Sequence, residues 1–584
     1  MSLLFAALRA QLARPIRKWR NRTLARRASL SGKLHIAEVL PEPMLFGAAE
    51  RGQALVSGSW QALGYDLDLQ ERSIWTLALP DKRLDAMRHG FTWLEDLAAL
   101  GNKSARELAQ QWLLEWAHRY GRGRGPGWTP DRAGLRLQQW TAHSALLSRG
   151  LSEPEIERFW RAFAAQQRYL EKCWRQADPG LAQMNALAGL VWSGVVLPDA
   201  GHRIAMAELG KLAEAYVDAE GEVSSRRPDD LGNALILLIW TARILENAGQ
   251  SAPPAHLSAI IRGVPVLRPL RMGDGSFARF HGGSGGDSDQ LDKALAELRI
   301  GAQQKPPLSM GFCRLTGGRN ALVLDAAEPP KGPLAQSAHA STLAFEWSVG
   351  RQPVIVNCGS GEAFGAEHSL KSRHTRCHST VEIGGRSSSQ IRSGGLTAST
   401  FGPQLEDGPS LVSLRQAQDA TGQWLLATHD GYSKSVGVIH ERRVFVEARG
   451  TELRGEDIIS VPDARARTVF ERASRSRPVT CCACFHVHPD ITAEMDTVRQ
   501  LILLLLPNES VWVFRASGGD LGLEPSVYYE ANSQKPRNTK QIRVDGKIQE
   551  NIAQLIWSFR RLRDAPKQSV SGSEPADIPS ASED

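Results

Sequence analysis

Side chains that can move protons or bind carboxylates gather in one stretch of the sequence, residues 337–380. In chain order they are His339, Asn357, Arg373, Arg376 and His378. Two apolar runs with strand character, 343–347 and 354–356, separate His339 from most of the others. If these runs pair in a sheet, imidazole, amide and guanidinium groups can share one of its faces. Imidazole suits general acid or base chemistry near neutral pH, and guanidinium suits carboxylate binding, so the stretch is a candidate site.

The composition is that of a folded protein with a basic balance. The chain has 584 residues, of which 42% are hydrophobic and 23% charged, so we expect two or three globular domains. The formal net charge of +7 favours an anionic partner, although it could also serve only solubility. Because the sequence has no basic recognition helix and no aromatic strand motif for RNA, we expect no nucleic-acid partner.

The cysteines do not indicate a disulfide scaffold. There are seven, an odd number, and no pair of CxxC motifs of the zinc-binding type occurs. The cluster at 481–484 lies in an apolar run, which favours buried thiols in a strand over metal ligands.

Residues 1–49 are expected to form a basic N-terminal arm. Residues 1–13 are largely apolar, and a run rich in arginine follows them at 14–27. A secretory signal carries its charge before the apolar core, whereas most of the charge here follows it, so we find no convincing signal peptide. The pattern predicts either an amphipathic arm in peripheral contact with an anionic membrane surface or a disordered leader.

Residues 50–306 are predicted to form a helical domain that begins with a short strand-rich segment. From about 85 to 262, apolar residues recur at helical spacing. The pair Thr129-Pro130 and the capping box at 152–155 mark two helix starts. Short loops rich in Gly, Pro and Asp separate the helices, which predicts an array of antiparallel helical hairpins.

Tryptophan is concentrated in the helical half. Twelve of the sixteen tryptophans precede residue 250, and most lie on apolar stripes, where we expect them in the core. Trp192 lies near a predicted helix end, where a groove would open, so it is a candidate for stacking on a sugar ring.

Residues 307–562 are predicted to form a succession of β-strands, with turn residues between them. This spacing predicts an antiparallel β-sandwich. Residues 563–584 are rich in Ser, Pro, Asp and Glu and are expected to be a disordered tail. The predicted fold class is therefore multidomain α+β, with helical hairpins followed by a sandwich.

Several short motifs of the second half carry a family resemblance. They are Ala338-His339-Ala340, Val356-Asn357-Cys358-Gly359, His378-Ser379-Thr380, His429-Asp430-Gly431-Tyr432, His440-Glu441-Arg442 and Phe485-His486-Val487-His488-Pro489. In order and spacing they resemble the heparinase II/III-like family of polysaccharide lyases, over most of residues 50–560. The resemblance implies an incomplete (α/α) toroid packed on a β-sandwich with an active cleft between them. It also implies cleavage of uronate-containing polysaccharides by β-elimination.

β-Elimination determines the roles that the resemblance assigns. The carboxylate beside C5 must be neutralised, a base must take the C5 proton, and an acid must protonate the leaving oxygen. The resemblance gives catalytic roles to His339, His378, Tyr432 and Asn185. It also implies a divalent metal, zinc or calcium, held by His339, Asn357 and His378. For Tyr432 the alternative is a tyrosine that anchors a turn.

The candidates for binding the substrate are Arg373, Arg376, Trp192 and Arg226. The two arginines near His378 could hold a carboxylate with two hydrogen bonds, or they could be ordinary surface charges. Arg226 precedes a predicted helix and would lie at the edge of a basic groove.

The chain departs from the family pattern at four positions. Ser337 stands where a first histidine is common, and Asn357 where an aspartate is. Phe277 or Phe280 takes the place of a tyrosine, and Ala186 that of a histidine.

The sequence thus predicts a polysaccharide lyase-like protein that cleaves an acidic, uronate-containing glycan by β-elimination. The alternative is a non-catalytic relative that binds an acidic glycan, which the four departures favour. The resemblance implies the cell envelope or periplasm, whereas the missing signal peptide leaves the cytoplasm open.

Overall fold

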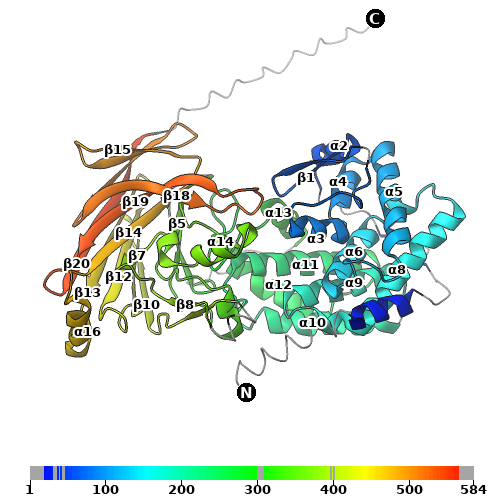
Figure 1. The fold of residues 1–584 in the computed structure, drawn as a ribbon, viewed down its shortest axis with the longest axis horizontal. Helices are drawn as coiled ribbons and strands as arrows, with labels where there is room; N and C mark the ends of the chain where they lie inside the picture. The colour runs from blue at the N-terminus through cyan, green and yellow to red at the C-terminus, as the bar shows by residue number, and fades with distance from the viewer. Residues whose placement is uncertain are drawn as a thin grey trace, which may run out of the picture.

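The computed structural model describes residues 19–29, 36–37, 40–41, 47–70, 72–198, 200–298, 308–394, 398 and 402–564. Helices dominate the first half of the chain and strands the second, and the two halves lie side by side (Figure 1). The predicted fold class is confirmed, because the protein is an incomplete (α/α) toroid of helical hairpins followed by an antiparallel β-sandwich. Across the described ranges, no helix has both the length and the apolar character that crossing a membrane requires.

The toroid is built from helices α2 to α13. Their bounds are α2 Ala49–Val56, α3 Lys82–Gly90, α4 Trp93–Leu100, α5 Lys103–Tyr120, α6 Pro130–Ala142, α7 Ser144–Ser148, α8 Glu153–Cys173, α9 Leu181–Val196, α10 Ala200–Tyr216, α11 Pro228–Asn247, α12 Pro254–Leu267 and α13 Ser288–Ala296. The predicted strand-rich opening segment is only partly right. It begins with α2, and the hairpin of β1 Ser59–Ala62 and β2 Tyr65–Asp68 follows.

Local sequence explains where several helices begin. The predicted capping box at the start of α8 is confirmed, since the Ser152 backbone N–H donates to Glu155 Oε2 at 2.9 Å. Helix α6 begins at Pro130, as predicted, but Thr129 makes no side-chain capping bond, so the predicted hydroxyl cap is wrong. Proline suits the first helical position because its φ is already helical and it has no N–H to satisfy there.

Helices α6 and α9 cross at very close range, and the crossing positions Asn185. A Cβ on Gly134 would collide with the backbone of Asn185 and Ala186, and one on Gly189 would collide with Gly134. Only glycine allows this approach, which presses α9 against α6 and fixes the Asn185 side chain at the inner rim of the toroid.

The sandwich consists of two antiparallel sheets, with helices α14 Ala366–Lys371 and α16 Ala464–Ser474 outside them. One sheet has the order β10 Val412–Gln418, β11 Gly422–His429, β12 Ile439–Glu447, β13 Glu452–Ser460, β20 Ile552–Arg563, β17 Val511–Ser517, β16 Leu501–Leu505 and β15 Thr492–Asp496. The other has the order β18 Asp520–Tyr528, β19 Arg537–Lys547, β14 Thr480–Val487, β6 Gln352–Val356, β5 Phe345–Val349, β4 Asn320–Asp325 and β3 Phe312–Gly317, with β7 Val381–Ile383 beside β14. A separate small ribbon joins β8 Gln390–Arg392 to β9 Gln404–Glu406.

Two predicted domain limits fall on or beside residues that the structure does not describe. The limit between 306 and 307 lies outside the described residues, between α13 and β3. Strand β20 runs to Arg563, so the predicted tail starts at its end, and residues 565–584 of that tail are outside the described residues.

The loop between β18 and β19 reaches from the sandwich to the toroid (Figure 1). Gln534 Nε2 in this loop donates to the Gly64 carbonyl at 2.6 Å, and Arg83 Nη1 of α3 donates to the Ala531 carbonyl at 3.1 Å. The β1–β2 turn that receives the loop needs a left-handed backbone, with φ of 52° at Leu63 and 73° at Gly64. The two halves therefore touch through this loop as well as through their main interface.

A buried ion pair joins the two sheets. The Arg442 guanidinium of β12 binds Asp457 of β13 through two hydrogen bonds of 2.7 and 2.9 Å, and both side chains are fully buried. The third nitrogen of Arg442, Nη1, donates to the carbonyls of Leu343 and Ser379 at 2.7 and 2.8 Å. These two carbonyls lie in loops of the opposite sheet. The pair satisfies its hydrogen bonds locally and fixes the spacing of the sheets.

Replacing Arg442 with alanine should destabilise the protein strongly, because Asp457 would keep a buried charge without its main partner. We expect a loss of about 3–5 kcal/mol in the free energy of unfolding. Arg443→Ala is the matched control, since Arg443 is half exposed and pairs with Glu441 and Glu456 at the surface. It should cost less than about 1 kcal/mol. Chemical denaturation measures the unfolding free energy of both variants. Equal losses in the two variants would refute the structural role of the Arg442–Asp457 pair.

Candidate functional site

Two histidines predicted to meet do lie together, at the junction of toroid and sandwich. His339 Nδ1 is 3.2 Å from His378 Nε2, and the His339 backbone N–H donates to His281 Nδ1 at 3.2 Å. His281 comes from the end of the toroid, and its Nε2 lies 3.6 Å from Asp325 Oδ2 of β4. We call these three rings the histidine cluster.

The histidine cluster is sealed from solvent. His339 is 4% exposed and His378 1%. Burial lowers the pKa of His378 to about 3 and, together with neighbouring positive charge, holds the pKa values of His339 and His281 well below their usual range. The rings are therefore neutral near pH 7 and are weak bases. A buried, weakly basic ring is a poor candidate for taking a proton from a polymer.

The predicted metal ligands do not form a suitable site. Asn357 Oδ1 accepts a hydrogen bond from the Ser379 backbone N–H at 3.1 Å, and its Nδ2 donates to the Arg279 carbonyl at 3.2 Å. The amide thus bonds to the backbone on both sides. Among the residues that the structure describes, no three His, Cys, Asp or Glu side chains are grouped to hold a metal ion. The residues present do not fit the zinc or calcium site that the family resemblance implies.

Tyr432 is also buried, with no exposed surface. Its hydroxyl donates to the Val381 carbonyl at 2.7 Å, and burial raises the pKa of the phenol. This geometry matches the alternative role, a tyrosine that anchors a turn, and leaves no proton free for a substrate.

Two of the predicted substrate-binding arginines bond to the protein itself. Arg373 is 4% exposed and donates to the carbonyls of Ala338, Pro403 and Ala335 at 2.7–2.9 Å. Arg226 reaches across the junction and binds Asp325 Oδ1 at 2.5 Å, with further bonds to the carbonyls of Met310 and Glu328. Neither guanidinium has room for a glycan carboxylate.

Arg376 is exposed, but it lines a different hollow, on the sandwich beside α14. That hollow contains neither the histidine cluster nor Asn185. The structure therefore does not bring Arg376 to the other predicted site residues.

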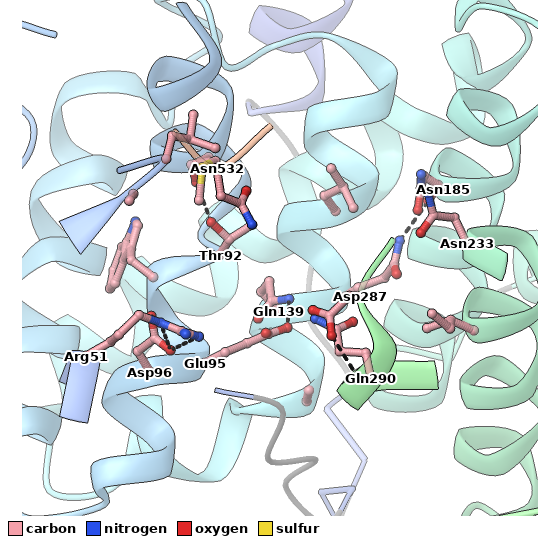
Figure 2. A pocket seen from close by; sticks show the side chains of 18 of the residues that line it. Arg51, Thr92, Glu95, Asp96, Gln139, Asn185, Asn233, Asp287, Gln290 and Asn532 are labelled. Carbon is pink, nitrogen blue, oxygen red and sulfur yellow. Dashed lines mark hydrogen bonds and ion pairs between the residues drawn. The ribbon is translucent and has the colours of Figure 1, made fainter. Parts of the chain in front are cut away.

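Asn185 and Trp192 do share a cavity, which we call the toroid cleft. It has a volume of about 900 Å³ and lies among helices α4, α6, α9 and α11, with Asn532 of the β18–β19 loop at its edge (Figure 2). Trp192 is a wall of this cleft, because it is only 4% exposed and its Nε1 donates to Thr241 Oγ1 at 2.9 Å. The aromatic residues of the lining are Trp60, Tyr65, Trp93, Trp192 and Trp240. None of His339, His378 and Tyr432 lines it.

The charges of the toroid cleft are mostly negative. Among its described lining residues, the carboxylates are Asp66, Glu95, Asp96 and Asp287, and the cation is Arg51. Arg51 already binds Asp96, with distances of 2.8–3.1 Å (Figure 2). An anionic polymer would meet unfavourable charge here.

Glu95 is a cleft residue that the sequence reasoning missed. Its Oε1 accepts a hydrogen bond from Gln139 Nε2 at 2.6 Å. Burial raises the pKa of the Glu95 carboxyl to about 7; the hydrogen bond from Gln139 lowers the pKa, and the charges of Asp96 and Asp287 raise it. In the sequence, Glu95 resembles an ordinary acidic residue in the first turn of a helix, so no local pattern reveals its environment.

Comparison with known proteins places the chain in a family. Residues 300–558 match the family model described as heparinase II/III-like, C-terminal. The chain is 30% identical over 520 residues to FtsZ-localized protein C of Caulobacter vibrioides, an alignment that covers 87% of this chain and 88% of the relative. The chain belongs to the heparinase II/III-like family.

Solved structures similar to this family member share its fold at low sequence identity. A crystal structure of heparinase III is 11% identical, with a TM-score of 0.65 and coverage of 95% of this chain and 91% of that one. Heparan sulfate lyase HepC from Pedobacter heparinus is 13% identical, with a TM-score of 0.54 and coverage of 93% and 88%. The polysaccharide lyase-like fold is therefore retained over nearly the whole chain.

The raised pKa of Glu95 should appear in the pH dependence of stability. The ordinary value is 4.5 and the folded value about 7, so the folded state binds the proton more tightly. The stability that this provides is complete below about pH 4.5 and is lost as pH rises to 7. The unfolding free energy of the wild type should therefore fall relative to Glu95→Gln by up to about 1 kcal/mol per pH unit in that window.

Denaturation at a series of pH values measures the difference. Glu157→Gln is the control, because its carboxylate is 58% exposed on the outer face of α8. A wild-type profile parallel to that of Glu95→Gln between pH 4.5 and 7 would contradict the assignment.

Proposed function

We propose that this chain is a saccharide-binding member of the heparinase II/III-like family that does not carry out β-elimination and that is localized with FtsZ. One observation supports the claim that the chain does not carry out β-elimination. The only predicted catalytic group in the toroid cleft is Asn185, whereas His339, His378 and Tyr432 are buried outside it. A base, an acid and a carboxylate binder therefore do not converge on one bound sugar.

The prediction that the glycan is acidic stays a prediction, and the cleft charges argue against it. A uronate needs its carboxylate neutralised before the C5 proton can leave. In the toroid cleft the one cation, Arg51, is already paired with Asp96. The aromatic rings and amides of the lining support binding of a sugar, but the lining does not favour a sugar that carries a carboxylate, such as a uronate.

Purified protein should release no unsaturated product from any uronate polymer. The expected result is a flat absorbance trace for the product double bond across heparan sulfate, heparin, hyaluronan and alginate, with heparinase III as the positive control. Product formation that Asn185→Ala abolishes would overturn the proposal and restore the lyase reading.

The relative named FtsZ-localized protein C supports the proposed localization with FtsZ, because the similarity extends over 87% of this chain. All seven cysteines are free, and the Sγ atoms of Cys482 and Cys484 lie 3.5 Å apart without a bond. Free thiols are usual in a reducing compartment. They support the cytoplasmic alternative over the periplasm.

The N-terminal arm supports contact with a membrane surface. Residues 19–28 form a helix that docks on the toroid through Ala25 and Ala28, and Arg168 Nε donates to the Ala28 carbonyl at 3.1 Å. Its other side exposes Trp19, which is 70% accessible, together with Arg22 and Arg26. Exposed tryptophan beside arginine is typical of helices that lie on anionic lipid.

A fluorescent fusion of the chain should overlap with labelled FtsZ in Caulobacter vibrioides cells and should partition with membranes after lysis. Reversing charge at Arg22 and Arg26 to Glu should move most of the protein to the soluble fraction, since each basic residue near anionic lipid contributes about 1 kcal/mol. The same reversals at Arg203 and Lys211, exposed on α10, are the control. A fusion spread evenly through the cell would argue against the proposal.

A further inference from the structure

We infer that the toroid cleft binds an oligosaccharide of amino sugars whose amino groups are free and positively charged. The inference rests on the proposed function and names the class of sugar. It starts from the arrangement of charge, because Glu95 and Asp287 face the same cavity from α4 and from the turn before α13 (Figure 2).

The carboxylates of the cleft lack enough cations to balance them. Arg51 is bonded to Asp96, and its charge also acts on Glu95 and Asp287, so among the described lining residues this one cation faces all the carboxylates. Asp287 caps α13 by accepting a hydrogen bond from the Gln290 backbone N–H at 3.0 Å, and Glu95 accepts one from the Gln139 amide. Each hydrogen bond occupies one carboxylate oxygen and brings no positive charge to it.

The proximity of Glu95 to other carboxylates has a measurable electrostatic effect. The negative charges of Asp96 and Asp287 both raise the pKa of Glu95. An ammonium group placed among these carboxylates would relieve the repulsion and form charge-assisted hydrogen bonds. A uronate carboxylate in the same place would add to the repulsion.

The rest of the lining fits a sugar better than a peptide or a metal ion. Tyr65 is partly exposed in the lining of the cavity, where an aromatic ring can stack on a pyranose face. Asn185 and Asn233 lie next to each other on α9 and α11 and offer amide donors and acceptors to hydroxyl groups (Figure 2). A volume of about 900 Å³ suits a short oligosaccharide.

The test is a calorimetric titration of the full chain with four probes. They are oligomers of glucosamine, oligomers of N-acetylglucosamine, oligogalacturonate and oligolysine. We expect the glucosamine oligomers to bind at least roughly tenfold more tightly than the N-acetylated ones, because acetylation removes the charge. Their affinity should fall as salt is added, and oligogalacturonate should not bind.

Variants show whether the cleft is responsible. Glu95→Gln and Asp287→Asn should each weaken glucosamine binding about tenfold and should weaken N-acetylglucosamine binding much less. Asparagine keeps the helix cap of α13, so the second variant should fold normally. Asp289→Asn is the matched control, since Asp289 is exposed on the same helix and does not line the cleft.

The other outcomes each overturn the inference and can be told apart. Equal binding of acetylated and free oligomers, or preference for oligogalacturonate, refutes the class of sugar but leaves the proposed saccharide-binding function standing. Oligolysine that binds as tightly as glucosamine oligomers assigns the cleft to a cationic peptide instead. If none of the saccharides binds, the proposed saccharide-binding function fails as well.

Discussion

The ion pair between Arg226 and Asp325 is the interaction on which the relation of toroid to sandwich depends. Arg226 lies in the loop before α11 and Asp325 at the end of β4, so the pair joins the two halves directly. Asp325 is fully buried, and it also accepts a hydrogen bond from Ser341 Oγ at 2.8 Å. A carboxylate so deeply buried needs its cation, because an unpaired charge there would be very costly. The pair therefore stabilises the contact between the two halves, and it leaves the Arg226 guanidinium bonded within the protein.

The predicted site residues at the junction are buried and bond to the protein itself. The histidine cluster, Arg226 and Arg373 have nearly all their polar atoms bonded within the protein. His339 and His378 belong to the family motifs, but the partners of these junction residues are backbone carbonyls, Asp325 and one another. A motif therefore shows which residues meet, whereas function depends on whether a ligand can reach them.

Much of the fold could be predicted from sequence because local signals agree with it. Helical periodicity, the capping box of α8 and the alternating strands all report on short segments of chain. The meeting of His339 and His378 was expected from the two strand-like runs between them. The environment of Glu95 and the carbonyls around Arg373 depend on contacts between distant segments, and no local pattern encodes these. The net charge was misleading for the same reason: the chain as a whole is basic, yet the described lining of the toroid cleft has more carboxylates than cations.

Asn532 of the β18–β19 loop lies at the edge of the toroid cleft, although this loop belongs to the sandwich. A ligand that extended to this edge would contact both halves of the molecule at once. Its binding would then add to the two hydrogen bonds, at Gly64 and Arg83, that hold the loop against the toroid.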